Sequence, residues 1–177
     1  MRRKGAGALV GRDALIVIRH DLGPGDVGEI TMLHAEVYTA EFGWDHRFEG
    51  YVARTLGEFA ERQPHERERI WIAEADGGIV GCIAIVDAGS DVAQLRWYLV
   101  DPHVRGRGLG RRLIEEAIAF TKEAGYRSVF LWTTSELRVA AHLYRSAGFA
   151  LVESVTRQSW GRPVVEERYV LSLERLH

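Results

Sequence analysis

The pattern of apolar and polar residues predicts strands and helices that follow one another closely along the chain. Residues Ala14 to Arg19 are rich in β-branched side chains and favour a first strand. Apolar residues then recur at helical spacing from Val27 to about Tyr38 and from Phe48 to about Phe59. A glycine- and proline-containing stretch before the first helix ends in Asp26, a residue type suited to capping. The aromatic and acidic residues 39–47 are expected to form the loop between the two helices.

The rest of the chain predicts a meander of three strands and then alternating helices and strands. Asp76-Gly77-Gly78 separates the first two strands and is typical of a tight β-hairpin turn. The third strand alternates apolar and polar residues, so one of its faces can line a cleft. An amphipathic helix follows residue 110 and ends before Gly125, which can adopt the left-handed conformation that terminates helices. The predicted ranges are 70–75, 79–86 and 92–100 for the meander, 128–133 for the next strand, 136–147 for the last helix, and 149–155 and 164–173 for the last strands.

The element order β-α-α-β-β-β-α-β-α-β-β predicts a mixed α/β fold. The chain has 177 residues, of which 46% are hydrophobic and 27% charged, as in ordinary soluble globular proteins. We expect a flexible tail over residues 1–13 and a single domain over residues 14–177. The net charge of -2 argues against a general nucleic-acid binder. The longest apolar runs are too short to span a membrane.

The cysteine and histidine residues of the chain argue against disulfide, covalent-cysteine and metal chemistry. Cys82 is the single cysteine, so an intrachain disulfide is impossible and a cytoplasmic location is expected. It falls in a predicted buried strand, so a core role is expected rather than a covalent acetyl-cysteine route. The seven histidines form neither an i, i+4 pair nor a His-Glu-x-x-His spacing, so no metal site is expected.

The turn Arg105-Gly106-Arg107-Gly108-Leu109-Gly110 connects the third meander strand to the amphipathic helix. Successive backbone N–H groups at a helix N-terminus bind phosphate groups, and the helix dipole favours the same charge. Glycine lets a bulky pyrophosphate approach these amides and permits positive φ angles. The alternatives are a structural tight turn, a dinucleotide-binding fingerprint and a P-loop. Arg111 stands where the fingerprint needs its third glycine, and the Gly-Lys-Ser/Thr of a P-loop is absent.

Two segments resemble the GNAT superfamily of acetyl-CoA-dependent N-acetyltransferases. Residues 99–110 resemble the acetyl-CoA-binding motif of that family, whose core is Arg/Gln-x-x-Gly-x-Gly/Ala. Residues 140–149 resemble its second signature, a helix carrying a tyrosine followed by Gly-Phe. The predicted elements match the family fold from about Ile16 to Leu173. The resemblance implies a mostly antiparallel central sheet flanked by helices, in which two parallel strands splay apart and hold acetyl-CoA between them.

The resemblance also implies roles for individual residues. Backbone amides at Leu99 and Val100 would bond the acetyl carbonyl, on which negative charge develops during aminolysis of a thioester. Tyr144 would protonate the leaving thiolate, although a tyrosine at this helical spacing is also a common core residue. Many family members carry an asparagine where this chain has Leu137, so its contact is either lost or replaced, with Thr134 or Ser135 as the candidates. The coenzyme is expected to contact Leu99, Val100, Arg105, Gly106, Arg107, Gly108, Leu109, Gly110, Arg111, Thr134, Ala140 and Tyr144.

Residues 38–45 and 131–133 more narrowly resemble the acetyltransferase half of regulators that fuse a MarR-type DNA-binding domain to a GNAT domain. The DNA-binding half has no counterpart in this sequence, and this resemblance supplies no substrate. The GNAT family often dimerises through its late strands, so a homodimer is one expectation. Neither nucleic acid nor a membrane is an expected partner.

The acceptor amine must lose a proton before attack, because an alkylammonium of pKa about 10.4 is almost wholly protonated at pH 7. Glu36, Glu41 and Asp45 are the candidate bases and Glu41 is the predicted one, with a solvated acidic loop as the alternative for each. This loop favours a cationic small-molecule or peptide amine, acetylated by direct transfer in a ternary complex. Trp160 and Arg162 either border the acceptor site or form a plain exposed hairpin, which is the favoured interpretation. A non-catalytic acyl-CoA-binding module and a nucleotide-binding domain are the competing functions.

Overall fold

The computed structural model describes residues 11, 14–62 and 65–173, and its elements follow the predicted order. The predicted tail over residues 1–13 lies outside the described residues apart from Gly11. The elements are β1 (Val17–Arg19), α1 (Asp26–Phe42), α2 (His46–Glu61), β2 (Arg69–Ala75), β3 (Gly78–Asp87), β4 (Val92–Val100), α3 (Leu109–Glu123), β5 (Ser128–Thr134), α4 (Arg138–Ser146), β6 (Ala150–Ser159) and β7 (Arg162–Ser172). A short 3-10 turn at Pro102–Val104 joins β4 to the loop before α3.

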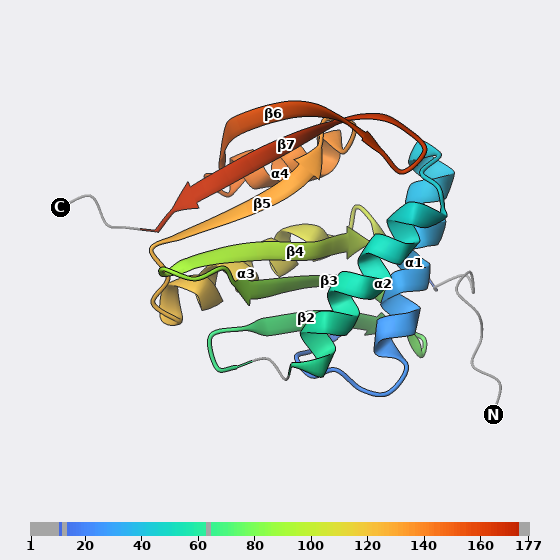
Figure 1. The fold of residues 1–177 in the computed structure, drawn as a ribbon. Helices are drawn as coiled ribbons and strands as arrows, with labels where there is room; N and C mark the ends of the chain where they lie inside the picture. The colour runs from blue at the N-terminus through green and yellow to red at the C-terminus, as the bar shows by residue number, and fades with distance from the viewer. Residues whose placement is uncertain (1–10, 12–13, 63–64, 174–177) are drawn as a thin grey trace.

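The seven strands form one sheet in the order β1-β2-β3-β4-β5-β7-β6. Every neighbouring pair is antiparallel except β4 and β5, which are parallel. Helices α1 and α2 cover one face of the sheet, and α3 and α4 lie on the other (Figure 1). Two apolar clusters result, one around Ile30, Leu56 and Ile72 under α1 and α2, and one around Leu113 and Leu131 on the opposite face. No helix in the described ranges is both long and apolar enough to cross a bilayer.

The junction between α1 and α2 is shorter than predicted. The helices cover most of residues 39–47 and leave only residues 43–45 between them. Gly43 ends α1 at a φ of 67°, and its N–H donates to the Thr39 carbonyl. Asp45 caps α2, because its side chain accepts the N–H of Arg47. The predicted aromatic and acidic loop is therefore largely helical, which fixes the directions of its side chains.

Asp26 does not cap α1 as predicted. Gly25 holds the N-cap position at a φ of 97°, and Asp26 is the first helical residue. Its buried carboxylate accepts the Gly23 N–H and lies 2.7 Å from a guanidinium nitrogen of Arg19. The carboxylate thus joins β1 to α1 instead of closing the helix end. The first strand is also shorter than predicted, because β1 begins at Val17 and not at Ala14.

Candidate active site

The parallel strands β4 and β5 separate along their length. Residues 92–94 of β4 pair with residues 128–130 of β5. Beyond that point β5 pairs with β7 up to Thr134, while β4 continues to Val100 on the side of β3. The carboxyl ends of the two strands therefore diverge and leave a gap, which is the splayed pair expected from the family resemblance.

A β-bulge bends β4 beside this gap. Trp97 has a φ of 48°, and the pairing of β4 with β3 shifts in register between Cys82 and Ala84. The thiol of Cys82 donates to the Trp97 carbonyl at 3.0 Å, and the hydroxyl of Tyr38 donates to the Tyr98 carbonyl at 3.3 Å. A positive φ is unusual for a bulky residue, so these bonds help to hold an uncommon conformation. Bulges next to active sites redirect side chains, and this one turns the end of β4 away from β5.

The backbone at the end of β4 supplies an amide to the gap. The N–H of Asp101 donates to the Val80 carbonyl of β3 at 2.8 Å. Because alternate residues of an antiparallel strand direct their N–H groups to opposite sides, Val100 directs its N–H away from β3. The same alternation directs the Leu99 N–H toward β3. Of the two predicted amides, Val100 therefore supplies the one that faces the gap.

The glycine turn forms the N-terminus of α3 as predicted. Gly106 and Gly108 have φ angles of 78° and 80°, in the region that favours glycine. Arg112 donates its N–H to the Gly108 carbonyl, so the preceding amides at the start of α3 have no partner within the helix. A Cβ atom added at Gly106 or Gly108 would meet nothing within 4 Å. This open space beside free amides fits the pyrophosphate of a coenzyme.

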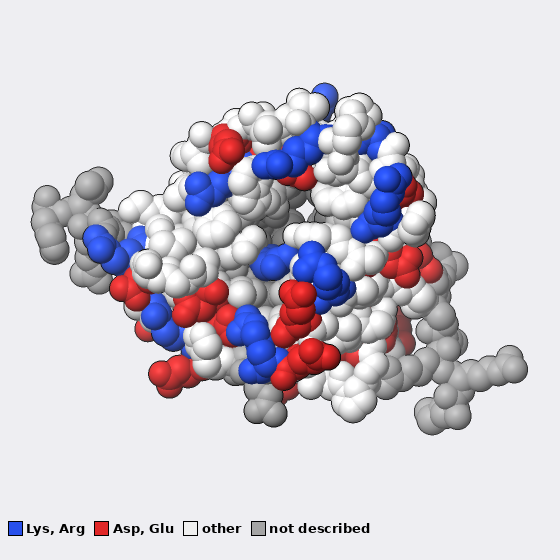
Figure 2. Space-filling model, in the orientation of Figure 1, with Lys and Arg blue, Asp and Glu red and all other residues white. Residues whose placement is uncertain are grey.

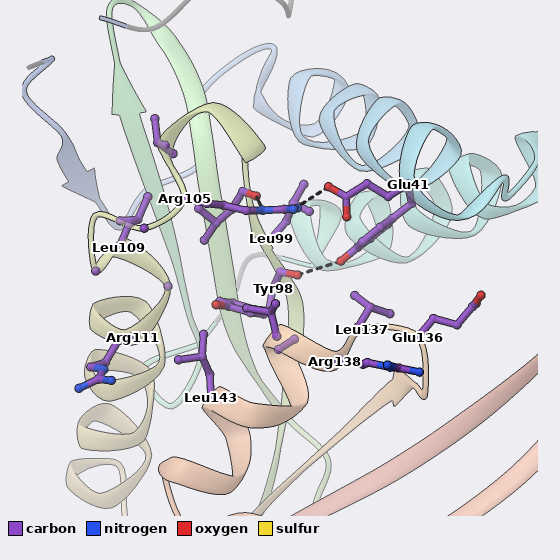
Figure 3. Close-up of a pocket in the computed structure, with 18 of the residues that line it drawn as sticks. Glu41, Tyr98, Leu99, Arg105, Leu109, Arg111, Glu136, Leu137, Arg138 and Leu143 are labelled. Atoms are coloured by element: carbon purple, nitrogen blue, oxygen red, sulfur yellow. Dashed lines mark hydrogen bonds and ion pairs between the residues drawn. The ribbon is translucent and has the colours of Figure 1, made fainter. Parts of the chain in front are cut away.

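Arg105 joins the turn to α1. Its Nε donates to the Val100 carbonyl at 3.1 Å, and its Nη1 lies 2.6 Å from a carboxylate oxygen of Glu41 (Figure 3). The side chains of Arg105 and Glu41 are 42% and 30% exposed, so water and ligands can reach the pair. Glu41, the predicted base, is thus held by an arginine on the same side of the gap as the glycine turn.

A cavity of about 520 Å³, here called the first cavity, lies over the glycine turn and the first turn of α4. Most predicted coenzyme-binding residues line it, namely residues 99–100, 105–106, 108–111 and 140. Arg107 lies outside its lining and donates instead to the Ala14 carbonyl at 2.7 Å. Thr134 and Tyr144 also lie outside it. The fold therefore brings nine of the twelve predicted coenzyme-binding residues together in one cavity and places these three elsewhere.

A second cavity, of about 570 Å³, lies between α2 and the β5–β7 part of the sheet. It contains Thr134 and Tyr144, and its walls are rich in aromatic side chains. Tyr38, Tyr98 and Leu137 line both cavities. The two cavities therefore meet at these three residues, next to the point where β4 and β5 separate.

The turn between β6 and β7 closes one end of the second cavity. The Trp160 ring packs on Trp44 and Phe48, with centroid separations of 4.5 Å and 5.0 Å. Arg162 donates to the last carbonyl of α1 and to the Glu136 carboxylate, each at 2.7 Å. The favoured interpretation of this segment as a plain exposed hairpin is wrong, because both side chains bind the opposite wall. Figure 1 shows the β6–β7 turn next to the α1–α2 junction.

Tyr144 is a buried side chain of α4 that lines the second cavity. It is 4% exposed, and its ring lies 5.7 Å from the ring of Tyr98, one of the residues common to both cavities. Burial raises the pKa of the Tyr144 phenol well above 10, and the nearby tyrosines raise it further. The phenol is therefore neutral at physiological pH and holds a proton that it can donate.

His34 of α1 is a second buried titratable group in the second cavity. It is 3% exposed, and its Nδ1 lies 2.8 Å from the Ile30 carbonyl. Since a carbonyl oxygen only accepts, Nδ1 carries the proton and Nε2 is the unprotonated nitrogen. Burial lowers the pKa of His34 to about 4, so the ring is neutral at pH 7.

The buried neutral histidine predicts a loss of stability in acid. The unfolded chain takes up a proton at the ordinary pKa of 6.5, whereas the folded chain resists until about pH 4. The free energy of unfolding should fall between these values, by on the order of 3 kcal/mol. Urea titrations of wild type and His34→Gln at a series of pH values test this. The variant should show a flatter dependence, and equal slopes would exclude His34 as the cause.

Comparison with known proteins identifies the family. A model described as the acetyltransferase (GNAT) family matches residues 30–149. The chain belongs to the GNAT family of acetyltransferases. An uncharacterised N-acetyltransferase of Schizosaccharomyces pombe is 30% identical over 131 residues, which cover 73% of this chain and 80% of that protein. An amino-acid acetyltransferase of Pseudomonas putida is 29% identical over 84% of this chain, which spans 31% of that protein.

Solved structures share the fold. A Salmonella typhimurium protein, solved with its cofactor acetyl-CoA, superposes with a TM-score of 0.68 at 19% identity, over 92% of this chain and 96% of that one. The predicted mixed sheet, mostly antiparallel with one parallel pair and flanked by helices, is thereby confirmed for this GNAT acetyltransferase. Its membership of the family makes acetyl-CoA the expected donor. No cluster of metal-binding side chains occurs among the residues that the structure describes.

The residues that the sequence did not mark for a role are mainly those of the second cavity. His34, Arg96 and Trp97 line it but looked like helix or strand positions in the sequence. For Trp97 the sequence contained one weak indication of a role in a site. It lies in a strand whose alternating apolar and polar residues predicted that one face could line a cleft. Its carbonyl accepts from Cys82 of β3 and the next carbonyl accepts from Tyr38 of α1, and such contacts between distant segments have no local sequence signature.

Proposed function

We propose that this GNAT protein transfers the acetyl group of acetyl-CoA to a primary amine by direct attack in a ternary complex. The observation that supports this most is the meeting of two cavities at Tyr38, Tyr98 and Leu137. One cavity offers a phosphate-binding helix N-terminus, and the other is separate and large enough for a small acceptor. A donor and an acceptor held from opposite sides would bring thioester and amine together without a covalent enzyme intermediate.

In this mechanism the amine nitrogen attacks the thioester carbon, the C–S bond breaks and an amide forms. The Val100 N–H would stabilise the oxyanion, a contribution of about 2.7–4 kcal/mol for one fixed donor. The Tyr144 phenol would donate its proton to the departing thiolate, and the resulting phenolate would take up the second proton that the attacking nitrogen loses as the amide forms. The proton of the ammonium must leave before attack, and Glu41 is the proposed base, acting through water. Tyr38 lies one helical turn before Glu41 and reaches the junction of the cavities.

The proposal is tested by the release of CoA thiol with a panel of amines. Enzymatic transfer requires release that depends on the added amine, followed by detection of the acetylated product. Cys82 does not disturb a thiol-reagent assay, because it is fully buried and burial raises its pKa to about 12. Coenzyme binding without amine-dependent release across the panel would favour an acyl-CoA-binding module. Binding of ATP and not of CoA would favour a nucleotide-binding domain.

Glu41→Gln is expected to lower kcat about hundredfold, the usual effect of removing a general base. Arg105 pairs with the Glu41 carboxylate at 2.6 Å, so Glu41 would act as a base once the coenzyme pyrophosphate binds Arg105 in its place. The KM for acetyl-CoA should therefore change much less than kcat. Steady-state kinetics in both substrates, with Glu36→Gln as a control from the same helix, measure the two effects. A raised KM with an intact kcat would leave Glu41 as a positioning residue for Arg105.

Other expectations also stay proposals. We keep a homodimer as a prediction, which the exposed edge strand β6 supports and which analytical ultracentrifugation can test. A closer kinship with the acetyltransferase half of MarR-GNAT fusions and a cytoplasmic location stay predictions as well. The likeness to an amino-acid acetyltransferase of Pseudomonas putida supports an amine that belongs to an amino acid.

A further inference from the structure

The charges around the second cavity do not favour the cationic acceptor expected from the sequence. The acidic residues behind that expectation, Glu36, Glu41 and Asp45, all lie outside the lining of this cavity. Within the cavity, Glu166 is paired with Arg157 at 2.9 Å. The remaining charged side chain in its lining is Arg96. The cavity therefore presents an excess of positive charge.

Arg96 is oriented but has no counter-ion. Its guanidinium carbon lies 4.8 Å from the centre of the Trp97 ring and 5.9 Å from that of Tyr51. One guanidinium nitrogen donates to the Tyr51 hydroxyl at 2.8 Å. No carboxylate among the described residues pairs with it. A planar guanidinium held by two rings keeps its other donors for an anion, and a carboxylate matches their geometry.

Two buried polar atoms on the same cavity also lack partners. The Trp44 side chain is 2% exposed and Thr134 is 3% exposed, and both residues line the cavity. Neither the Trp44 Nε1 nor the Thr134 Oγ1 has a hydrogen-bond partner in the described part of the chain. Buried polar atoms are nearly always paired, so unpaired ones at a cavity mark places for a ligand or water. An indole N–H only donates, so it too suits an electron-rich ligand group.

Aromatic rings form a large part of the remaining cavity wall. Phe48, Trp97, Trp132 and Trp160 contribute rings, and Trp132 is 39% exposed. Figure 2 shows the face between α2 and the β5–β7 strands as a hollow, with both basic and acidic side chains around it. A volume of about 570 Å³ is ample for one amino acid with a ring-bearing side chain.

We propose that the acceptor is a free amino acid with an aromatic or large apolar side chain, whose carboxylate binds Arg96. This inference rests on the proposed function, because it names the acceptor of the same transfer. Arg96 precedes Val100 by four residues on β4, about 13 Å along an extended strand, a distance that the arginine side chain and the bound amino acid would span together. The carboxylate would fix the amine near the junction, and the rings would select the side chain.

The first test compares matched substrates that differ in the carboxylate alone. Phenylalanine is compared with phenethylamine and phenylalaninamide, and tryptophan with tryptamine, by kcat/KM in the thiol assay. The amino acids should be preferred about tenfold to hundredfold, the usual effect of one charge-assisted contact. Alanine and aspartate should be poorer than phenylalanine, because neither fills the aromatic walls. Equal or better acetylation of phenethylamine would overturn the carboxylate contact while leaving the proposed transferase function intact.

The second test removes the guanidinium. Arg96→Gln should raise the KM for phenylalanine about tenfold or more and leave that for phenethylamine unchanged. Arg54→Gln is the matched control, because Arg54 also lies over the Tyr51 ring, at 6.0 Å, but outside the cavity. A purely structural Arg96 would instead affect both substrates alike. If Arg96→Gln fails to fold, the wild-type substrate comparison still decides the proposal.

A binding experiment distinguishes the proposed amino-acid acceptor from the proposed transferase function. Tryptophan fluorescence of the wild-type protein with CoA present should report saturable binding of phenylalanine, since Trp44, Trp97 and Trp160 line the cavity. Such binding without any acetylation would support the acceptor site and overturn the transferase function. Acetylation of amines whether or not they carry a carboxylate would support the transferase function and overturn the proposed amino-acid acceptor.

Discussion

Gly108→Ala is expected to weaken acetyl-CoA binding about hundredfold while leaving the fold intact. Gly108 precedes α3 at a φ of 80° and lines the first cavity. An added Cβ meets no protein atom within 4 Å, so it stands in the space beside the helix N-terminus. There it would hold the pyrophosphate away from the amides. The loss of charge-assisted bonds of about 1.5–3 kcal/mol corresponds to roughly tenfold to more than hundredfold in the dissociation constant.

Gly77→Ala provides the matched control for this variant. Gly77 lies in the β2–β3 turn at a φ of 79°, and a Cβ there also meets nothing within 4 Å. Both variants should lose about 1 kcal/mol of stability, because both place a side chain in a left-handed conformation. Isothermal titration with CoA should show weakened binding for Gly108→Ala alone. Equal affinities in the two variants would show that the turn does not hold the pyrophosphate.

The first cavity could be predicted because its main parts are local in sequence. The turn from Arg105 to Gly110 contains its own conformational requirement, namely glycine at positive φ directly before a helix. The signature around Tyr144 likewise lies within one helix and the residues that end it. Such short-range features do not depend on contacts with distant segments of the chain. The strand, turn and helix of this site therefore lie where the pattern predicted them.

The boundaries near α1 and α2 were less predictable because capping decided them. Gly43 and Asp45 end one helix and begin the next within three residues, so aromatic residues expected in a loop became helical. This difference changes the expected surroundings of Glu41. It was predicted in a loop near the acceptor and lies instead in α1 beside Arg105. A carboxylate expected to attract a cation therefore lies outside the lining of the second cavity.

The second cavity could not be predicted because it depends on contacts between distant segments. Trp160 reaches Trp44 across more than a hundred residues, and Arg96 becomes part of a cavity only when β4 separates from β5. In a sequence, aromatic residues at helical or strand spacing look the same whether they fill a core or line a cavity. The direction in which β4 bends decides between these roles, and that bend depends on the bulge at Trp97.

Tyr144→Phe is expected to lower turnover about hundredfold and leave acetyl-CoA affinity nearly unchanged. Removing one proton donor from a transition state has an effect of this size. The ring of Tyr144 packs against Tyr98, and phenylalanine preserves that packing. Because burial holds the phenol pKa well above 10, wild-type activity should not fall through ionisation of Tyr144 at assay pH values below 10. Pre-steady-state measurement of the transfer step, with coenzyme affinity measured separately, distinguishes chemistry from binding.

Tyr126→Phe is the matched control, because it removes a buried tyrosine hydroxyl that lies outside both cavities. Tyr126 is as buried as Tyr144, at 4% exposure, but lies outside the lining of both cavities. Its hydroxyl donates to the Arg67 carbonyl at 2.9 Å, so its removal costs stability and should not change turnover. If both variants turn over like wild type, Tyr144 is a core residue and the thiolate takes its proton from water. If Tyr144→Phe alone is slow with coenzyme affinity intact, the hydroxyl acts in the transfer step, on the side of the junction from which the amine approaches.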